Sequence, residues 1–132
     1  MKDRYSYYSE NLERLRKEYN DYKSLYIAFD FDNTVFDYHQ VGDTYPIVEK
    51  LLTECKQLGF KLILFTANED EKLEKAIQYC TEHGYAPDYI NESPIMKTRK
   101  PFYNLLLDDR AGLGESIKLL SELIQSIKEE KL

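Results

Sequence analysis

Three short apolar runs in this chain each stop at side chains that can bind ligands or react. The first run, residues 24–29, leads into the acids Asp30 and Asp32; the second, residues 61–65, stops at Thr66; the third, residues 104–107, stops at Asp108 and Asp109. Runs of this length predict buried strands. The carboxyl ends of the strands form the ligand crevice of an open α/β sheet, so we expect these side chains to converge although they lie far apart in sequence.

Helical patterns separate the apolar runs. Apolar residues recur at steps of three and four in four segments, which predicts four amphipathic helices. Pro46 fits an early helical turn, Gly59 and Gly84 fit left-handed C-caps, and Asn68 with Glu71 resembles a capping box. The four expected apolar faces are Tyr5, Tyr8, Leu12, Leu15, Tyr19 and Tyr22; Ile47, Leu51, Leu52, Cys55 and Leu58; Leu73, Ala76, Ile77 and Cys80; and Leu113, Ile117, Leu120, Ile124 and Ile127.

This alternation of strands and helices predicts a three-layer α/β/α, Rossmann-like fold with a mainly parallel sheet of four or five strands, including a short strand around residues 88–90. The 132 residues suffice for one core, so we expect a single domain in which residues 1–23 form an additional N-terminal helix and residues 24–132 the core. We expect that helix to dock on its own domain, because tertiary packing supplies most helix stability. Dimerisation through the helix is the alternative.

Composition restricts the partners. A hydrophobic content of 42% with 32% charged residues is typical of a soluble globular protein. No apolar stretch is long enough to span a membrane, and no secretory signal is evident. We therefore expect a cytoplasmic location without membrane association. The net charge of -6 disfavours nucleic acid as a partner. Cys55 and Cys80 lie on apolar helical faces and are expected to behave as core hydrophobes, since no partner histidine spacing indicates a metal site.

The strand-end acids indicate metal and phosphoryl chemistry. Carboxylates forced to one rim repel each other, and a divalent cation relieves that repulsion; ligand sets made of oxygen alone favour Mg²⁺. A carboxylate can also accept a phosphoryl group covalently when nearby groups neutralise its charge, a role open here to Lys97, Arg99 or Lys100 together with the Thr66 hydroxyl. The local alternatives are turn capping by the aspartates and threonines, and a surface ion network around Asp108 and Asp109.

The motif Asp30-Phe31-Asp32-Asn33-Thr34, the strand-terminal Thr66, a downstream lysine and the pair Asp108-Asp109 together resemble, in this order, the haloacid dehalogenase superfamily of phosphohydrolases. The resemblance covers roughly residues 25–127 and implies a magnesium-dependent phosphomonoesterase. It makes Asp30 the nucleophile that accepts the phosphoryl group and Asp32 the acid and base. It makes Thr66 a ligand of a phosphate oxygen and Lys100 the charge-balancing lysine, with Lys97 as the alternate. Mg²⁺ would be held by Asp30, the backbone carbonyl of Asp32, Asp108 and Asp109, with either of the last two bound directly or through water.

Superfamily members usually select substrates with a cap inserted after the first strand or between the second strand and the lysine. Here residues 35–42 leave room only for a flap, and an ordinary crossover helix fills the second position. The chain therefore resembles a capless member, a type that accepts phosphates on large or exposed substrates or borrows a neighbouring subunit as a lid. The phosphorylated substrate and a homo-oligomeric state stay open. The alternative function is a non-catalytic Mg²⁺ or phosphoryl-binding module, or an interaction module, on the same fold; a receiver domain is disfavoured because its acidic pair precedes the phosphoacceptor strand.

Overall fold

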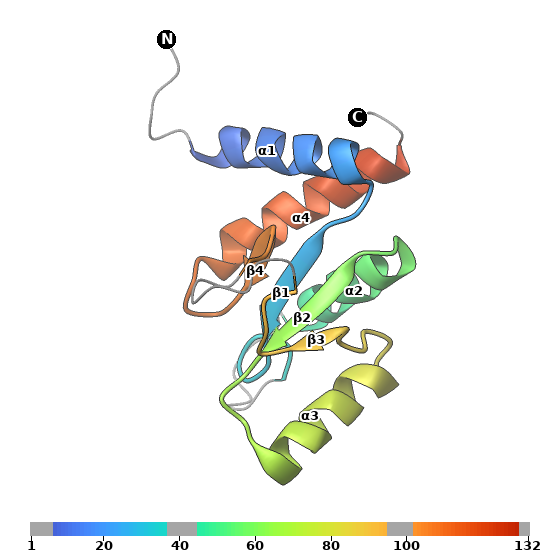
Figure 1. The fold of residues 1–132 in the computed structure, drawn as a ribbon. Helices are drawn as coiled ribbons and strands as arrows, with labels where there is room; N and C mark the ends of the chain where they lie inside the picture. The colour runs from blue at the N-terminus through green and yellow to red at the C-terminus, as the bar shows by residue number, and fades with distance from the viewer. Residues whose placement is uncertain (1–6, 37–44, 95–101, 130–132) are drawn as a thin grey trace.

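Four parallel strands form the sheet, in the order β3-β2-β1-β4, in a computed structural model that describes residues 7–36, 45–94 and 102–129 (Figure 1). Helices flank this sheet, so the α/β class and the Rossmann-like parallel architecture predicted from the sequence are confirmed, with four strands. The elements in chain order are α1 (Tyr7–Tyr22), β1 (Tyr26–Asp30), α2 (Tyr45–Gln57), β2 (Lys61–Phe65), α3 (Asp70–Glu82), β3 (Tyr89–Ile90), β4 (Leu105–Leu107) and α4 (Leu113–Lys128).

Strand β1 has a neighbouring strand on each side, and its residues between Tyr26 and Asp30 are apolar because helices cover the faces of the sheet. Ile27, Ala28 and Phe29 are fully buried there. β1 pairs with β2 in a register that sets Asp30 opposite Phe65, and with β4 in a register that sets Phe29 opposite Leu107. A continuous apolar run of this kind is typical of a buried parallel strand.

Alternate strand residues point to one hydrophobic cluster that the helices complete. Ile27 and Phe29 of β1 lie in this cluster with Leu62 and Leu64 of β2 and Leu107 of β4. The helices add three groups of buried side chains: Val48, Leu51, Leu52 and Cys55 from α2, Ala76 and Cys80 from α3, and Leu119, Leu120, Leu123 and Ile124 from α4. Burial of apolar area on this scale is the main driving force for the fold.

Aromatic rings from three strands and from the segment before β4 pack against one another. The ring of Tyr26, at the start of β1, packs against Tyr89 of β3 and edge-on against Phe102, which precedes β4. Phe65, at the end of β2, meets Tyr103 in the same edge-on way. These tyrosines thus serve packing, with ring geometries that aromatic pairs prefer.

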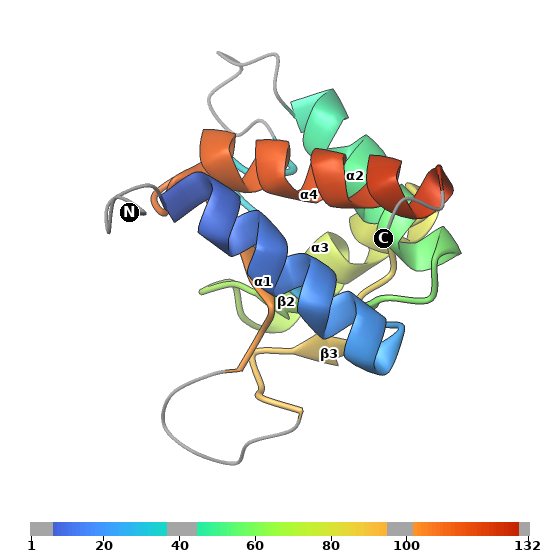
Figure 2. The ribbon, with the colours of Figure 1, turned by 90° about the horizontal axis from the view of Figure 1, so that it is seen from above.

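Helix α1 docks on its own domain, as expected from its stripe. It lies across the end of the sheet at which β1 begins and packs on α4 (Figures 1 and 2). Leu12 and Leu15 join the hydrophobic cluster, and the ring of Tyr19 packs against Phe60. The predicted stripe is wrong at its end, because Tyr22 is 79% exposed. The expected contributions of Tyr5 and of the Tyr8 side chain lie outside the described residues.

A single amide side chain ties α1 to the two strands beside it. The backbone N–H of Tyr26 donates to the Asn104 side-chain oxygen at 2.6 Å, and the Asn104 side-chain nitrogen donates to Glu18 at 2.9 Å. Arg14 donates to the Asn104 backbone carbonyl. Asn104 therefore fixes the start of β4 against the start of β1.

Two local predictions for α2 and α3 need correction. Ile47, assigned to the buried face of α2, is 48% exposed, and its neighbour Val48 is buried instead. The capping box at Asn68 is wrong as well, because the N-cap of α3 is Glu69 and no side chain caps it. The sequence also predicts that α2 begins near residue 43 or 44, and these positions lie outside the described residues.

The predicted chain reversals and cysteine environments are confirmed. Gly59 and Gly84 adopt φ values of 82° and 93°, in the left-handed region where a Cβ is disfavoured. Cys55 and Cys80 are free and fully buried, and desolvation raises the pKa of the Cys80 thiol to about 12. Neither thiol is poised to react. In the described part of the chain, no helix combines the length and the apolarity that crossing a bilayer requires.

Candidate active site

Strand register brings the predicted acids together at the carboxyl edge of the sheet. Asp30 is the last residue of β1, and Asp108 directly follows β4. Because Phe29 pairs with Leu107, the next residue of each strand comes level with the other, so Asp30 and Asp108 lie side by side. The convergence expected from the sequence is found for these two strands.

Asp30, Asp108 and Asp109 form a carboxylate cluster. Each offers an oxygen, and these oxygens lie within 4.8 Å of one another; Asp30 and Asp108 are partly buried, and Asp109 is exposed. Three hard oxygen ligands in this arrangement suit Mg²⁺ or a similar hard cation. The Asp32 carboxylate is not part of this group in the described chain.

The carboxylate cluster destabilises the charged form of Asp30. Burial is the largest effect on Asp30 and raises its pKa from 3.8 to about 6, with repulsion by Asp108 and then Asp109 adding to it. The backbone N–H of Phe31 opposes this by donating to the carboxylate. A cation among the three carboxylates would remove the repulsion and restore the charge that a nucleophilic carboxylate needs.

A buried threonine links the two acidic segments. Thr34 is fully buried, and its hydroxyl accepts a hydrogen bond from the backbone N–H of Asp109 at 3.0 Å. The same hydroxyl lies 3.5 Å from a carboxylate oxygen of Asp30 and 3.5 Å from one of Asp109, and its single proton can serve one of them at a time. The sequence analysis considered Thr34 only as a turn residue. The structure gives it a role in setting the distance between the first and last acids.

A residue with positive φ follows each of the four strands. Asn33 follows β1, Asn91 follows β3 and Gly112 follows β4, with φ values of 62°, 52° and 66°, and after β2 it is Asp70, the first residue of α3, with a φ of 51°. Left-handed non-glycine residues cost conformational energy and gather at sites where the surrounding structure holds them. Three of the four, Asn33, Asp70 and Asn91, are not glycine, so the surrounding structure must hold their backbone in this conformation.

Thr66 is held at the end of β2 by residues of two loops. Its backbone N–H donates to the side-chain oxygen of Asn91 at 2.8 Å, and its hydroxyl accepts the backbone N–H of Asn68 at 3.1 Å. The Asn68 side-chain amide donates in turn to a carboxylate oxygen of Asp32 at 3.4 Å. These bonds connect two predicted site residues, Thr66 and Asp32, through a residue that the sequence analysis assigned to a helix cap.

The basic residues considered for charge neutralisation, Arg99 among them, lie outside the described residues. Lys100 and its alternate Lys97 both fall outside the described residues, as does most of the flap after β1. Between β2 and β4 the described residues form α3, β3 and short loops, as expected for a chain without a cap at that point.

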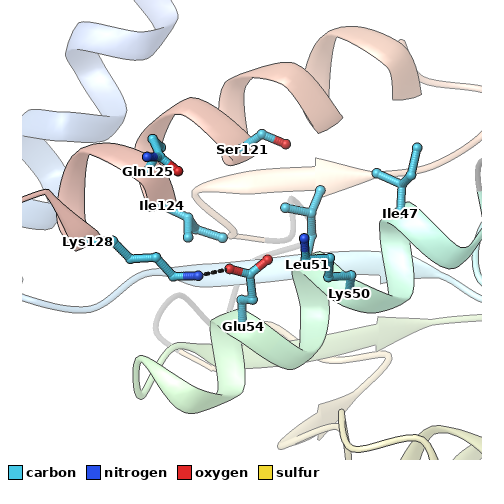
Figure 3. A pocket seen from close by; sticks show the side chains of 8 residues that line it. All are labelled: Ile47, Lys50, Leu51, Glu54, Ser121, Ile124, Gln125 and Lys128. Atoms are coloured by element: carbon cyan, nitrogen blue, oxygen red, sulfur yellow. Dashed lines mark hydrogen bonds and ion pairs between the residues drawn. The ribbon is translucent and has the colours of Figure 1, made fainter.

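Two hollows formed by described residues lie apart from the carboxylate cluster. One groove of about 270 Å³ runs between α2 and α4; Figure 3 shows Glu54 and Lys128 joined by an ion pair at one part of it and Ile47 on its wall. A second, of about 760 Å³, lies beside the end of α1 and includes Tyr22 and Phe102 in its wall. Neither includes a predicted site residue.

Comparison with known proteins supports the fold. A conserved protein from Bacteroides thetaiotaomicron has a solved structure that superposes with a TM-score of 0.59 and 29% sequence identity, covering 83% of this chain and 93% of that chain. No family model matches the chain, and no curated protein matches it.

Proposed function

We propose that this protein is a magnesium-dependent phosphohydrolase of the haloacid dehalogenase type, acting on phosphomonoesters through an aspartyl-phosphate on Asp30. The observation that carries the proposal is the carboxylate cluster of Asp30, Asp108 and Asp109 at the carboxyl edge of the sheet. The order of the sequence motifs supports the same reading.

The donor set fits Mg²⁺. Asp30, Asp108 and Asp109 supply oxygen ligands only, and the backbone carbonyl of Asp32 is the fourth expected ligand. Bound there, Mg²⁺ would neutralise carboxylate charge and polarise a phosphoryl oxygen.

The chain's own residues divide the reaction into two displacements. An Asp30 carboxylate oxygen forms a bond to phosphorus while the bond from phosphorus to the alcohol oxygen breaks, and Asp32 donates its proton to that departing oxygen. Asp32, now charged, removes a proton from water, whose oxygen attacks phosphorus and releases Asp30 and inorganic phosphate. Thr66 donates its hydroxyl proton to a phosphoryl oxygen, and Lys100, or Lys97 as alternate, balances the negative charge.

The lack of room for a cap in the sequence favours a phosphate carried on a large or exposed substrate. The acidic net charge argues against nucleic acid. The sequence also predicts a cytoplasmic location. A neighbouring subunit could serve as a lid, as the resemblance to capless members implies.

Turnover of a phosphomonoester panel tests the proposal. We expect Mg²⁺-dependent phosphate release that a chelator abolishes and that Asp30→Asn reduces by at least about 10³-fold, since the nucleophile is lost. Asp21→Asn is the matched control, because Asp21 lies on α1 in an exposed pair with Lys17. Absence of turnover on every ester, or full activity of Asp30→Asn, would refute it. A crystal soaked with Mg²⁺ and beryllium fluoride would show which carboxylate bonds the phosphoryl mimic.

A further inference from the structure

Asn68 occupies the loop between β2 and α3, two residues after Thr66. Its backbone N–H contacts the Thr66 hydroxyl and its side-chain amide contacts the Asp32 carboxylate. The residue is partly buried. It therefore touches two residues to which the proposed reaction assigns separate tasks.

Helix capping does not explain this side chain. The N-cap of α3 is Glu69, and Asn68 makes no capping bond. An asparagine just before a helix usually spends its side chain on the first free N–H groups of that helix. Here the amide turns to the rim instead.

The two contacts have distinct chemical effects. A hydroxyl that accepts one N–H keeps its own proton free to donate, so the Asn68 backbone directs the Thr66 O–H away from its loop. An amide donor on one oxygen of the Asp32 carboxylate restrains the rotation of that group and leaves the other oxygen free to carry the proton. The separation of 3.4 Å is at the long end for a hydrogen bond, and catalytic bonds of this kind tighten when substrate binds.

We infer that Asn68 is a positioning residue that orients Asp32 for proton transfer to the leaving group. This inference rests on the proposed function and adds a residue to it. Asn68 acts through Asp32, so its removal harms the step in which a proton must reach the leaving oxygen. Hydrolysis of an ester whose leaving group departs without a proton should keep its rate.

Two substrates separate this role from a structural one. 4-Nitrophenyl phosphate releases a stable phenolate that needs no proton, whereas glycerol 3-phosphate releases an alkoxide that does. For both, kcat/KM reports events up to departure of the leaving group. We expect Asn68→Ala to lower kcat/KM about 10- to 100-fold for glycerol 3-phosphate and less than about 3-fold for 4-nitrophenyl phosphate. The larger loss is a fraction of the rate enhancement that general acid catalysis provides.

Controls make each outcome decisive. Glu69→Gln alters the adjacent exposed side chain, which makes no capping bond, and should leave both substrates unaffected. Asn68→Ser, too short to reach Asp32, replaces Asn68→Ala if circular dichroism shows that the alanine variant does not fold. Equal losses on both substrates, or no loss on either, would overturn the role of Asn68 while leaving the proposed function intact. Failure of the wild-type protein to hydrolyse any ester of the phosphomonoester panel would instead remove the proposed function, and this role with it.

Discussion

The backbone N–H of Asp109 donates to the hydroxyl of Thr34 at 3.0 Å, joining residues that lie 75 positions apart in the chain. Thr34 is fully buried, so this bond replaces a contact with water. It holds the loop after β1 against the loop after β4, and with it the spacing of the carboxylate cluster.

Replacing Thr34 by valine should therefore weaken both the fold and the metal site. The variant keeps the shape of the side chain but leaves the Asp109 N–H without its acceptor, which costs about 1–3 kcal/mol of unfolding free energy. Groups that orient metal ligands typically contribute 10- to 100-fold in affinity, so we expect a Mg²⁺ dissociation constant raised by roughly 10-fold. Urea unfolding and calorimetric titration measure the two effects. Thr81→Val, on the exposed side of α3, should change stability by less than about 0.5 kcal/mol, and an equal effect of both substitutions would contradict the assignment.

The raised pKa of Asp30 predicts a pH-dependent stability in the absence of metal. Its folded-state pKa of about 6 exceeds the ordinary 3.8, so the folded state binds the proton more tightly, and stability falls as pH rises from about 4 to 6. The side chain is only half buried, and after allowance for solvent screening the cost of its charge is on the order of 1–2 kcal/mol. Asp30→Asn should be more stable than wild type by this amount at pH 7.5 and nearly equal to it at pH 4. Urea unfolding with chelator at the two pH values measures this, and a pH-independent difference would speak against the cause given.

Magnesium should stabilise the folded protein through the same three carboxylates. With a dissociation constant of about 1 mM, 10 mM Mg²⁺ adds about 1.4 kcal/mol and raises Tm by roughly 3–6 °C at pH 7.5. The rise should shrink at pH 5, where the proton occupies Asp30. Thermal melts with MgCl₂, and with NaCl at matched ionic strength, check this. A rise that persists in Asp108→Asn would place the ion elsewhere.

Helix α1 provides a stability test that is independent of the chemistry. Leu15 is fully buried, whereas Tyr22 on the same helix is 79% exposed. Leu15→Ala should cost about 2–5 kcal/mol through lost burial and the cavity left behind. Tyr22→Ala should stay within about 0.5 kcal/mol. Chemical unfolding of both variants measures the difference, with light scattering as a check that neither changes the oligomeric state. Similar values would mean that α1 does not pack as described.

The strand pattern was the most predictable part of the fold. The run at residues 61–65 coincides with β2, because five apolar positions between Gly59 and Thr66 leave little choice of boundary. The acids at the ends of β1 and β4 were predicted to meet, since parallel strands present their carboxyl ends on one edge. Side-chain periodicity was less reliable. The face of α2 is turned so that Val48, rather than Ile47, is buried, and tertiary packing, which local sequence does not show, decides between adjacent residues.

The finer contacts of the site required coordinates. Asn68 followed by acidic residues is a common signature of a helix start, and the competing carboxylate of Asp32 lies 36 positions away, which local sequence cannot reveal. Thr34 carried one usable signal, a threonine four residues after Asp30, but its partner Asp109 comes from a distant loop. The choice between Lys97 and Lys100 stays a prediction from chain order.

The all-parallel pairing of β1 has a consequence for how the chain acquires its structure. Tyr26 and Asn104, which bond at the start of β1 and β4, lie 78 positions apart, and no hairpin brings these strands together early. Pairings of such long sequence separation must overcome a large loss of chain entropy first and make folding slow. During synthesis on the ribosome, Asp30 emerges long before Asp108, so the carboxylate cluster is incomplete until β4 has been made. Until then, of the described strands, the nascent chain contains only β1, β2 and β3.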